Sequence, residues 1–222
     1  LLYVPFFFSF LTPSCFKRDL GKKQIRYNGY TELSYLHPNR YTPNPEVLDG
    51  IGLCKDDQFI VLRFVSWAAS HDLGQHGIGN KMKFIRELES YGQVLISSEG
   101  RLERDLERYK INISPEKLHD LMYYASLYIG EGATMATEAA LLGTPSIYIS
   151  SLARTMGNFN ELEKDYELLY SYKETTEALF KVFELMREPG VKAKWQSKRK
   201  KLLEDKIDVT AFIIWMVENY PE

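Results

Sequence analysis

The sequence predicts an α/β protein in which a parallel sheet is covered by helices on both faces. Short apolar runs typical of buried strands alternate with segments of helical periodicity. Glycine and proline mark the boundaries between these segments. Such alternation is built from right-handed crossovers, which bring successive strands into one parallel sheet.

The expected elements follow in order from residue 59. Strands are expected at residues 59–65, 93–96, 125–129 and 146–149, and helices at 79–91, 102–109, 115–124, 134–142, 174–187, 191–203 and 209–219. Ser114 is expected to cap the helix that has Pro115 at its first position. Trp195, Trp215 and Met216 have helical spacing and are interpreted as packing residues.

The segment before residue 59 is less regular. Residues 6–11 are interpreted as a strand whose sheet is largely missing, because the chain begins within an apolar run. Residues 12–57 are rich in Pro, Asn, Gly and Tyr, so they are expected to form an ordered connector. The opening segment lacks the features of a signal peptide, and it is shorter than the roughly 20 residues that cross a bilayer.

Composition narrows the class of protein. The chain has 222 residues, of which 45% are hydrophobic and 26% charged, as in a soluble globular protein. Its net charge of −2 gives no reason to expect a nucleic-acid partner. Cys15 and Cys54 lie far apart without metal-ligand spacing, which favours a reducing compartment. The basic run at 198–201 is followed by acidic residues and is interpreted as a solvated face.

Residues 125–150 carry the clearest functional signal. A buried strand ends at Gly130-Glu131-Gly132, and Thr134 is expected to cap the helix that follows. A glycine loop that leads into a helix N-terminus presents backbone N–H groups and the positive end of the helix dipole to an anion. The order of elements therefore predicts a phosphate-binding turn.

Glu138 lies one turn beyond the expected cap. A carboxylate there is placed to accept hydrogen bonds from ribose hydroxyls. The alternative is purely structural, because glycine turns of this kind occur throughout α/β proteins, and the helix dipole alone favours a glutamate in the first turns.

Loops after other strands open at the same edge of a parallel sheet. The loop after the first strand contains Ser70 and His71; His71 is interpreted as a phosphate donor or acid–base group, or else as a capping or solvent-exposed residue. The loop after the second contains Ser98 and Glu99, which form a turn and cap or contact a base or ribose. His119 is expected to be structural, with a position facing the cleft as the alternative.

Three segments, FVSWAASHDLG, GQVLISSEG and GEGATMATEAALLGTPSIYIS, together resemble the C-terminal half of the GT-B superfamily of nucleotide-sugar enzymes. The family resembled most is the domain of unknown function 354 family of glycosyltransferase-like proteins. Residues 130–145 are similar to the donor-binding motif of the peptidoglycan N-acetylglucosaminyltransferase and to a motif of the non-hydrolysing UDP-N-acetylglucosamine 2-epimerases. The resemblance implies that residues 46–222 form a Rossmann-like domain, the C-terminal domain of a GT-B fold, with a crossover helix at its end. Residues 1–45 would be the end of a largely absent N-terminal domain and the interdomain linker.

The resemblance also assigns roles. Gly132, Ala133 and Thr134 would supply the diphosphate-binding turn, and Glu138 would take the ribose hydroxyls of a UDP-like donor. His71 falls where the epimerases carry a histidine, but the residues after it differ, which weakens the epimerase assignment. The residues expected to bind the donor are Gly130, Glu131, Gly132, Ala133, Thr134, Glu138, Ser70, Ser98 and Glu99, with His71 as the candidate catalytic residue.

The leading hypothesis is a metal-independent glycosyltransferase that uses a nucleotide-diphosphate sugar as its donor substrate and no other cofactor. The alternatives are an isomerase resembling the UDP-N-acetylglucosamine 2-epimerases and a nucleotide-binding module without catalysis. Expected partners are the nucleotide sugar, a sugar or lipid-linked acceptor, and a missing N-terminal domain or a second copy of the chain. No nucleic acid and no transmembrane segment are expected, and the expected location is cytoplasmic or peripheral at the membrane.

Overall fold

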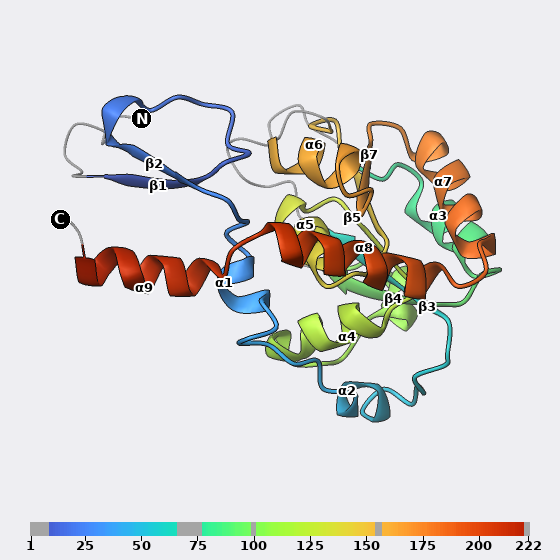
Figure 1. Ribbon diagram of the computed structural model, residues 1–222. Helices are drawn as coiled ribbons and strands as arrows, with labels where there is room; N and C mark the ends of the chain where they lie inside the picture. The colour runs from blue at the N-terminus through green and yellow to red at the C-terminus, as the bar shows by residue number, and fades with distance from the viewer. Residues whose placement is uncertain (1–8, 66–76, 99–100, 154–156, 220–222) are drawn as a thin grey trace.

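The centre of the protein is a five-stranded parallel sheet with strand order β4-β3-β5-β6-β7 (Figure 1). The computed structural model describes residues 9–65, 77–98, 101–153 and 157–219. The strands are β3 (Phe59–Phe64), β4 (Gln93–Ser98), β5 (Leu127–Gly130), β6 (Ser146–Ile149) and β7 (Leu169–Tyr172). The fold class expected from the sequence is confirmed.

The strand order contains one change of direction. From β3 the chain moves outward to β4, beyond which a single parallel bridge joins Ile96 to Lys110. It then returns to the other side of β3 and adds β5, β6 and β7 in turn. In open parallel sheets, ligands bind beyond the carboxyl ends of the strands at such a switch point. The topology therefore singles out the carboxyl ends of β3 and β5.

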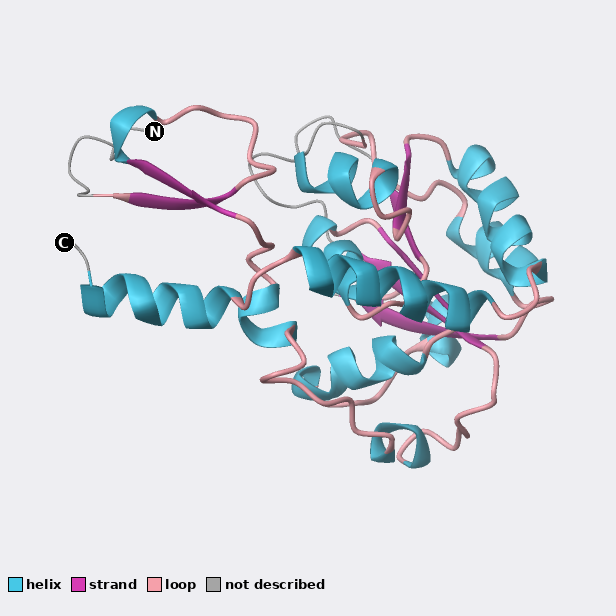
Figure 2. Cartoon of the chain, in the orientation of Figure 1, coloured by secondary structure: helices cyan, strands magenta, loops and turns pink. Residues whose placement is uncertain are grey.

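Helices cover both faces of the sheet (Figure 2). α3 (Lys81–Leu88) and α7 (Thr175–Arg187) lie on one face, where Tyr91 stacks on Phe183 with ring centroids 5.4 Å apart. The opposite face carries α4 (Leu118–Tyr124), α5 (Ala133–Leu141) and α6 (Gly157–Lys164). α8 (Val191–Asp205) runs past the C-terminal end of α5, where Arg199 Nε donates to the Leu141 carbonyl at 2.8 Å.

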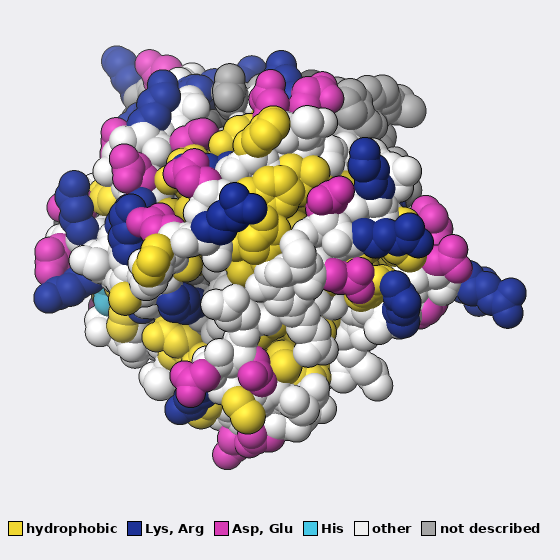
Figure 3. All heavy atoms as spheres, turned by 90° about the vertical axis from the view of Figure 1, so that its right-hand side faces the viewer, with side chains coloured by type: hydrophobic (Ala, Val, Ile, Leu, Met, Phe, Trp, Pro, Cys, Tyr) yellow, Lys and Arg dark blue, Asp and Glu magenta, His cyan; other side chains and the backbone are white. Residues whose placement is uncertain are grey.

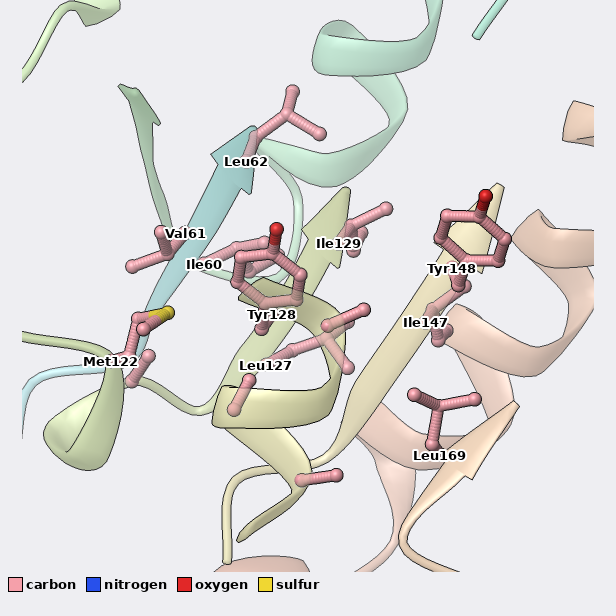
Figure 4. Close-up of a cluster of buried hydrophobic side chains, with 14 of the residues drawn as sticks. Ile60, Val61, Leu62, Met122, Leu127, Tyr128, Ile129, Ile147, Tyr148 and Leu169 are labelled. Atoms are coloured by element: carbon pink, nitrogen blue, oxygen red, sulfur yellow. The ribbon is translucent and has the colours of Figure 1, made fainter. Parts of the chain in front are cut away.

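The core lies in the middle of this sheet, with side chains of β3, β5 and β6 on both of its faces (Figure 4). Ile60, Val61 and Leu62 are consecutive and fully buried, and all of β5 is buried. Strands covered on both sides have no polar face, which is why the sequence shows continuous apolar runs instead of alternation. Gly130 ends β5 and leads the chain to the edge of the sheet.

A smaller unit, formed by residues 9–32 and called the N-terminal unit below, lies beside the main sheet. β1 (Phe10–Pro13) pairs in parallel with β2 (Gln24–Tyr27), and the 3-10 helix η2 (Gly21–Lys23) lies between them. The short helices α1 (Leu33–Leu36) and α2 (Glu46–Asp49) follow, and α9 (Val209–Asn219) lies next to this unit (Figure 1). Residues 12–57 are thus ordered, as expected, but they form more than a connector because they contribute β2 and two short helices.

Contacts of α9 with α1 and with the N-terminal unit join the two ends of the described chain. Thr210 Oγ1 donates to the Ser34 carbonyl at 2.5 Å, and the rings of Phe212 and Tyr27 lie 5.6 Å apart. Trp195 is 1% exposed, which confirms it as a packing residue. Trp215 in α9 also packs, on the ring of Phe212 with centroids 6.3 Å apart, but it is 57% exposed and lies outside the core.

Two capping predictions also need correction. α5 begins at Ala133 with Gly132 as its N-cap, so Thr134 does not cap it and lies exposed in its first turn. Ser114 precedes the 3-10 helix η4 (Pro115–Lys117), with Pro115 at its start as expected, but the serine makes no capping hydrogen bond. The expected helix at 115–124 is in fact η4 followed by α4, and the expected helix at 102–109 is a 3-10 helix, η3 (Arg104–Tyr109).

The surface shows mixed charge. On the face that carries α3 and α7, basic and acidic side chains are interspersed around hydrophobic ones (Figure 3). None of the described helices has the length and apolar character needed to span a membrane. Nor do the described residues contain a cluster of three or more His, Cys, Asp or Glu side chains able to hold a metal ion.

Candidate functional site

The candidate site is built around the N-terminus of α5, which begins where β5 reaches the carboxyl edge of the sheet. Gly132 has extended backbone angles, with φ −91° and ψ 125°, and turns the chain into the helix. Ala136 N–H is the first to bond within the helix, to the Gly132 carbonyl at 3.2 Å. The N–H groups of Ala133, Thr134 and Met135 have no acceptor among the described residues. These amides and the helix dipole give the N-terminus of α5 a positive electrostatic potential at the switch point.

The two glycines of the turn serve different purposes. A Cβ on Gly130 would lie 2.2 Å from the hydroxyl of the buried Tyr128, so this position is required by packing. A Cβ on Gly132 would find its nearest neighbour, a methyl group of Val65, at 3.4 Å, which is an ordinary contact. Because its φ is negative, Gly132 is not required by the backbone conformation either. The described residues therefore leave space beside Gly132.

Glu131 makes contacts with the chain on both sides of residues 66–76. Its carboxylate accepts hydrogen bonds from Val65 N–H at 3.0 Å and from Ile78 N–H at 2.7 Å, and the residue is 3% exposed. Gly77 lies so close that a Cβ there would collide with this carboxylate. The acid thus fixes the end of β3 and the approach to α3 relative to the turn.

Glu138 lies one turn further along α5 and is 7% exposed. Its Oε1 accepts a hydrogen bond from the Tyr35 hydroxyl at 2.7 Å and lies 3.2 Å from His119 Nε2. Its Oε2 has no hydrogen-bond partner among the described residues. Burial alone would raise the pKa of Glu138, but the bonds from His119 and Tyr35 and the charges of His119 and Arg63 hold it below the usual value.

Three elements therefore converge on this one carboxylate. Tyr35 comes from α1, His119 from α4 and Glu138 from α5, and the Tyr35 and His119 rings lie 5.7 Å apart. Tyr35 and His119 remain partly open, with 42% of the tyrosine and 28% of the histidine side chain exposed. His119 is partly buried, as its structural interpretation expects, and it also lies beside the carboxylate of the candidate site. No pattern in the sequence indicates that Tyr35 reaches Glu138.

A cation at the end of β3 was also missed from the sequence. Arg63 Nη1 donates to Ser97 Oγ at 2.6 Å, which links the carboxyl ends of β3 and β4, and its charge lowers the pKa of Glu138. Ser98, the last residue of β4, lies at the same edge and is partly buried. Ser70, His71 and Glu99 lie outside the described residues, so their predicted roles stay predictions.

Residues 16–222 match the family described as "Protein of unknown function (DUF354)". The chain belongs to this family. No curated protein matches the sequence of this DUF354 protein.

Solved structures show the same fold at low identity. The wall teichoic acid polymerase TagF is 13% identical, with a TM-score of 0.51 over 97% of this chain and 58% of its own. The spinosyn forosaminyltransferase SpnP is 15% identical, with a TM-score of 0.50 over 89% of this chain and 51% of its own. Os79 from O. sativa, in complex with UDP and deoxynivalenol-3-glucoside, is 13% identical, with a TM-score of 0.52 over 83% of this chain and 46% of its own.

The DUF354 chain thus has the fold of part of a GT-B glycosyltransferase. It spans about half of the length of these solved proteins. At this level of identity the likeness concerns the fold, and the chemistry has to be argued from the site itself.

Proposed function

We propose that this chain binds a nucleotide-diphosphate sugar and that the intact protein is a glycosyltransferase. The observation that carries the proposal is the α5 N-terminus at the switch point of the sheet, where the amides of Ala133, Thr134 and Met135 have no acceptor in the described part of the chain. A diphosphate fits this position because it carries concentrated negative charge and accepts several hydrogen bonds. The space that the described residues leave beside Gly132 lets the diphosphate approach the backbone closely.

In this proposal the helix N-terminus also promotes the reaction. When the bond between the sugar and the diphosphate breaks, negative charge develops on the leaving group. Fixed N–H dipoles stabilise that charge without having to reorient, and the Arg63 guanidinium adds positive potential at the same edge of the sheet. The proposed transfer is therefore metal-independent.

Glu138 is proposed to bind the ribose. Its lowered pKa keeps the carboxylate ionised at neutral pH, so it acts as a hydrogen-bond acceptor for the ribose hydroxyls. Oε1 already accepts from Tyr35, whereas Oε2 has no partner among the described residues. Tyr35 and His119 then act as positioning residues that fix the orientation of the carboxylate.

Calorimetry with UDP and UMP tests the diphosphate site directly. We expect UDP to bind more tightly than UMP, and Gly132→Ala to remove most of this preference because its methyl group occupies the space beside the turn. Gly50→Ala is the matched control: Gly50 has φ −62° and lies at the end of α2, and its nearest neighbour to an added Cβ is 3.6 Å away. Equal affinities for UDP and UMP in the unmodified chain, or an equal effect of both variants, would contradict the proposal.

A further inference from the structure

A cavity of about 380 Å³ lies between the N-terminal unit and the start of α6. Its lining includes Phe16, Lys17 and Arg18 from the loop after β1, Tyr30 and Glu32 from the segment before α1, and Asn158 from α6. Its volume falls within the range of small-molecule sites.

The cavity adjoins the proposed donor site. Asn158 Nδ2 donates to Thr137 Oγ1 at 3.2 Å, which joins the cavity wall to α5 one residue before Glu138. Glu32 immediately precedes α1, the helix whose Tyr35 bonds Glu138, and the negative charge of Glu138 acts on Glu32. A molecule in the cavity would therefore lie next to a sugar donor bound at α5.

The wall that carries Phe16, Lys17 and Arg18 is held by one side chain. The Arg26 guanidinium on β2 donates to the carbonyls of Ser14, Phe16 and Arg18. α6 closes against the same loop, since a Cβ on its first residue would lie 2.0 Å from the Cys15 carbonyl oxygen. The loop is thus fixed before any ligand binds, which limits the entropy lost on binding.

The side chains of this wall remain available for a ligand. Phe16 is 39% exposed, and an open aromatic face of this kind binds the apolar face of a ring. Lys17 and Arg18 are exposed and form no ion pair among the described residues, so two adjacent positive charges are free for an anionic group.

Glu32 provides the one carboxylate among the described lining residues. It is partly buried and makes no hydrogen bond to another described side chain. Burial raises its pKa, opposed by a hydrogen bond from its own backbone, and the negative charge of Glu138 raises it further. A carboxylate in such surroundings is a better proton acceptor than an ordinary surface glutamate.

We infer that this cavity is the acceptor site and that it takes a carbohydrate bearing an anionic group. The sugar ring packs on Phe16, the anionic group binds Lys17 and Arg18, and one hydroxyl faces Glu32. The inference rests on the proposed glycosyltransferase function. In the proposed sugar transfer, the acceptor oxygen forms a bond to the anomeric carbon of the donor, and the proton of that oxygen passes to the Glu32 carboxylate. The bond between that carbon and the diphosphate oxygen breaks, and the nucleoside diphosphate leaves with the electron pair.

Binding of glucose 6-phosphate, glucose and inorganic phosphate to this chain tests the site. We expect glucose 6-phosphate to bind about tenfold more tightly than either of the others, because charge-assisted hydrogen bonds add to ring packing. The double variant Lys17→Ala/Arg18→Ala should bind glucose 6-phosphate no better than glucose. Lys22→Ala/Lys23→Ala removes two adjacent exposed charges outside the cavity lining and should change nothing.

Equal binding of glucose 6-phosphate and inorganic phosphate, or an equal loss in both double variants, overturns the inference. Titration with UDP tests the donor site separately. Neither double variant changes a residue of α5, so both should bind UDP like the unmodified chain. A chain that binds UDP but not glucose 6-phosphate lacks the acceptor site; the reverse result contradicts the donor site alone.

The role of Glu32 has its own test in the intact protein, with UDP-glucose as donor probe and glucose 6-phosphate as acceptor probe. Glu32→Gln should lower kcat by about a hundredfold, as expected for loss of a general base, and leave the acceptor KM nearly unchanged. Glu177→Gln, on the exposed surface of α7, is the control. An unchanged kcat in Glu32→Gln overturns the assignment.

Discussion

The Tyr35 hydroxyl lies 2.7 Å from Oε1 of Glu138, although 103 residues separate them in the chain. This bond ties the segment that leaves the N-terminal unit to the helix at the proposed donor site. His119, on a third element, lies 3.2 Å from the same oxygen. The geometry of the carboxylate is therefore set by residues that belong to neither the turn nor its helix.

Tyr35→Phe should weaken the binding of UDP and of UMP to the same extent. The substitution removes one hydrogen bond to a charged acceptor, worth about 1.5–3 kcal/mol, while the ring remains. Because the ribose contact is common to both nucleotides, the preference for UDP over UMP should persist. Tyr41→Phe is a matched control, since its hydroxyl donates to Asp120 at 2.6 Å instead of to Glu138. Calorimetry in which Tyr35→Phe changes only the UDP affinity would contradict the ribose role of Glu138.

The two glycines of the turn should respond differently to alanine. Gly130→Ala forces the added methyl group against the buried Tyr128 and should lower the free energy of unfolding by about 1–3 kcal/mol. Gly132→Ala meets only an ordinary contact and should cost at most about 1 kcal/mol, the difference between glycine and alanine at an N-cap. Urea denaturation measures both. A larger loss for Gly132→Ala would show that its space is part of the protein's own packing.

Much of the main sheet could be predicted from the sequence because its strands are buried on both faces. The strand at residues 146–149 was predicted with its observed bounds, and α9 likewise. β7, with sequence LYSY, was missed because it alternates buried and half-buried residues over only four positions. β2 was missed because it lies in a segment rich in turn-forming residues and is stabilised by tertiary contacts, such as its pairing with β1.

Only the part of the candidate site whose residues are close together in the sequence could be predicted. The turn at 130–132 and Glu138 lie within one short segment, so strand and helix patterns place them together. Tyr35 and Arg63 come from other elements and reach Glu138 through tertiary packing and charge. Nothing in their local pattern signals this, because a contact across 103 residues depends on the completed fold.

The stability of the protein should depend on Glu138 at acidic pH. Because its pKa in the folded protein lies below that of the unfolded chain, the carboxylate stabilises the fold above the unfolded pKa. This contribution is lost as the pH falls through the folded pKa, where the carboxylate becomes protonated and no longer attracts His119 and Arg63.

The difference in unfolding free energy between the unmodified protein and Glu138→Gln should therefore be largest near neutral pH and shrink below about pH 4. Denaturation curves from pH 3 to 7 measure it. Glu103→Gln, on the exposed surface, is a control expected to show little dependence on pH. A difference that grows towards acidic pH would mean that the folded protein favours the protonated form of Glu138.

A partly buried ion pair joins Lys206, the residue after α8, to Glu161 of α6. Lys206 is 8% exposed, and its Nζ lies 2.5 Å from Oε1 of Glu161. The other oxygen of Glu161 accepts a hydrogen bond of 2.6 Å from Tyr30, which also lines the proposed acceptor cavity. The pair thus connects α6, the N-terminal unit and the segment before α9.

Lys206→Met should destabilise the protein by about 3 kcal/mol, because it leaves a poorly solvated carboxylate without its cation. Lys206→Met combined with Glu161→Leu should recover much of that loss, since no uncompensated charge then remains. The surface pair Lys198–Glu167, whose charged atoms lie 3.1 Å apart with Glu167 63% exposed, is the control, and Lys198→Met should cost less than about 1 kcal/mol. Urea denaturation of these three variants and of Glu161→Leu alone measures these terms. If the double variant were as unstable as the sum of its single substitutions, the two side chains would contribute independently and the pair would have no coupling.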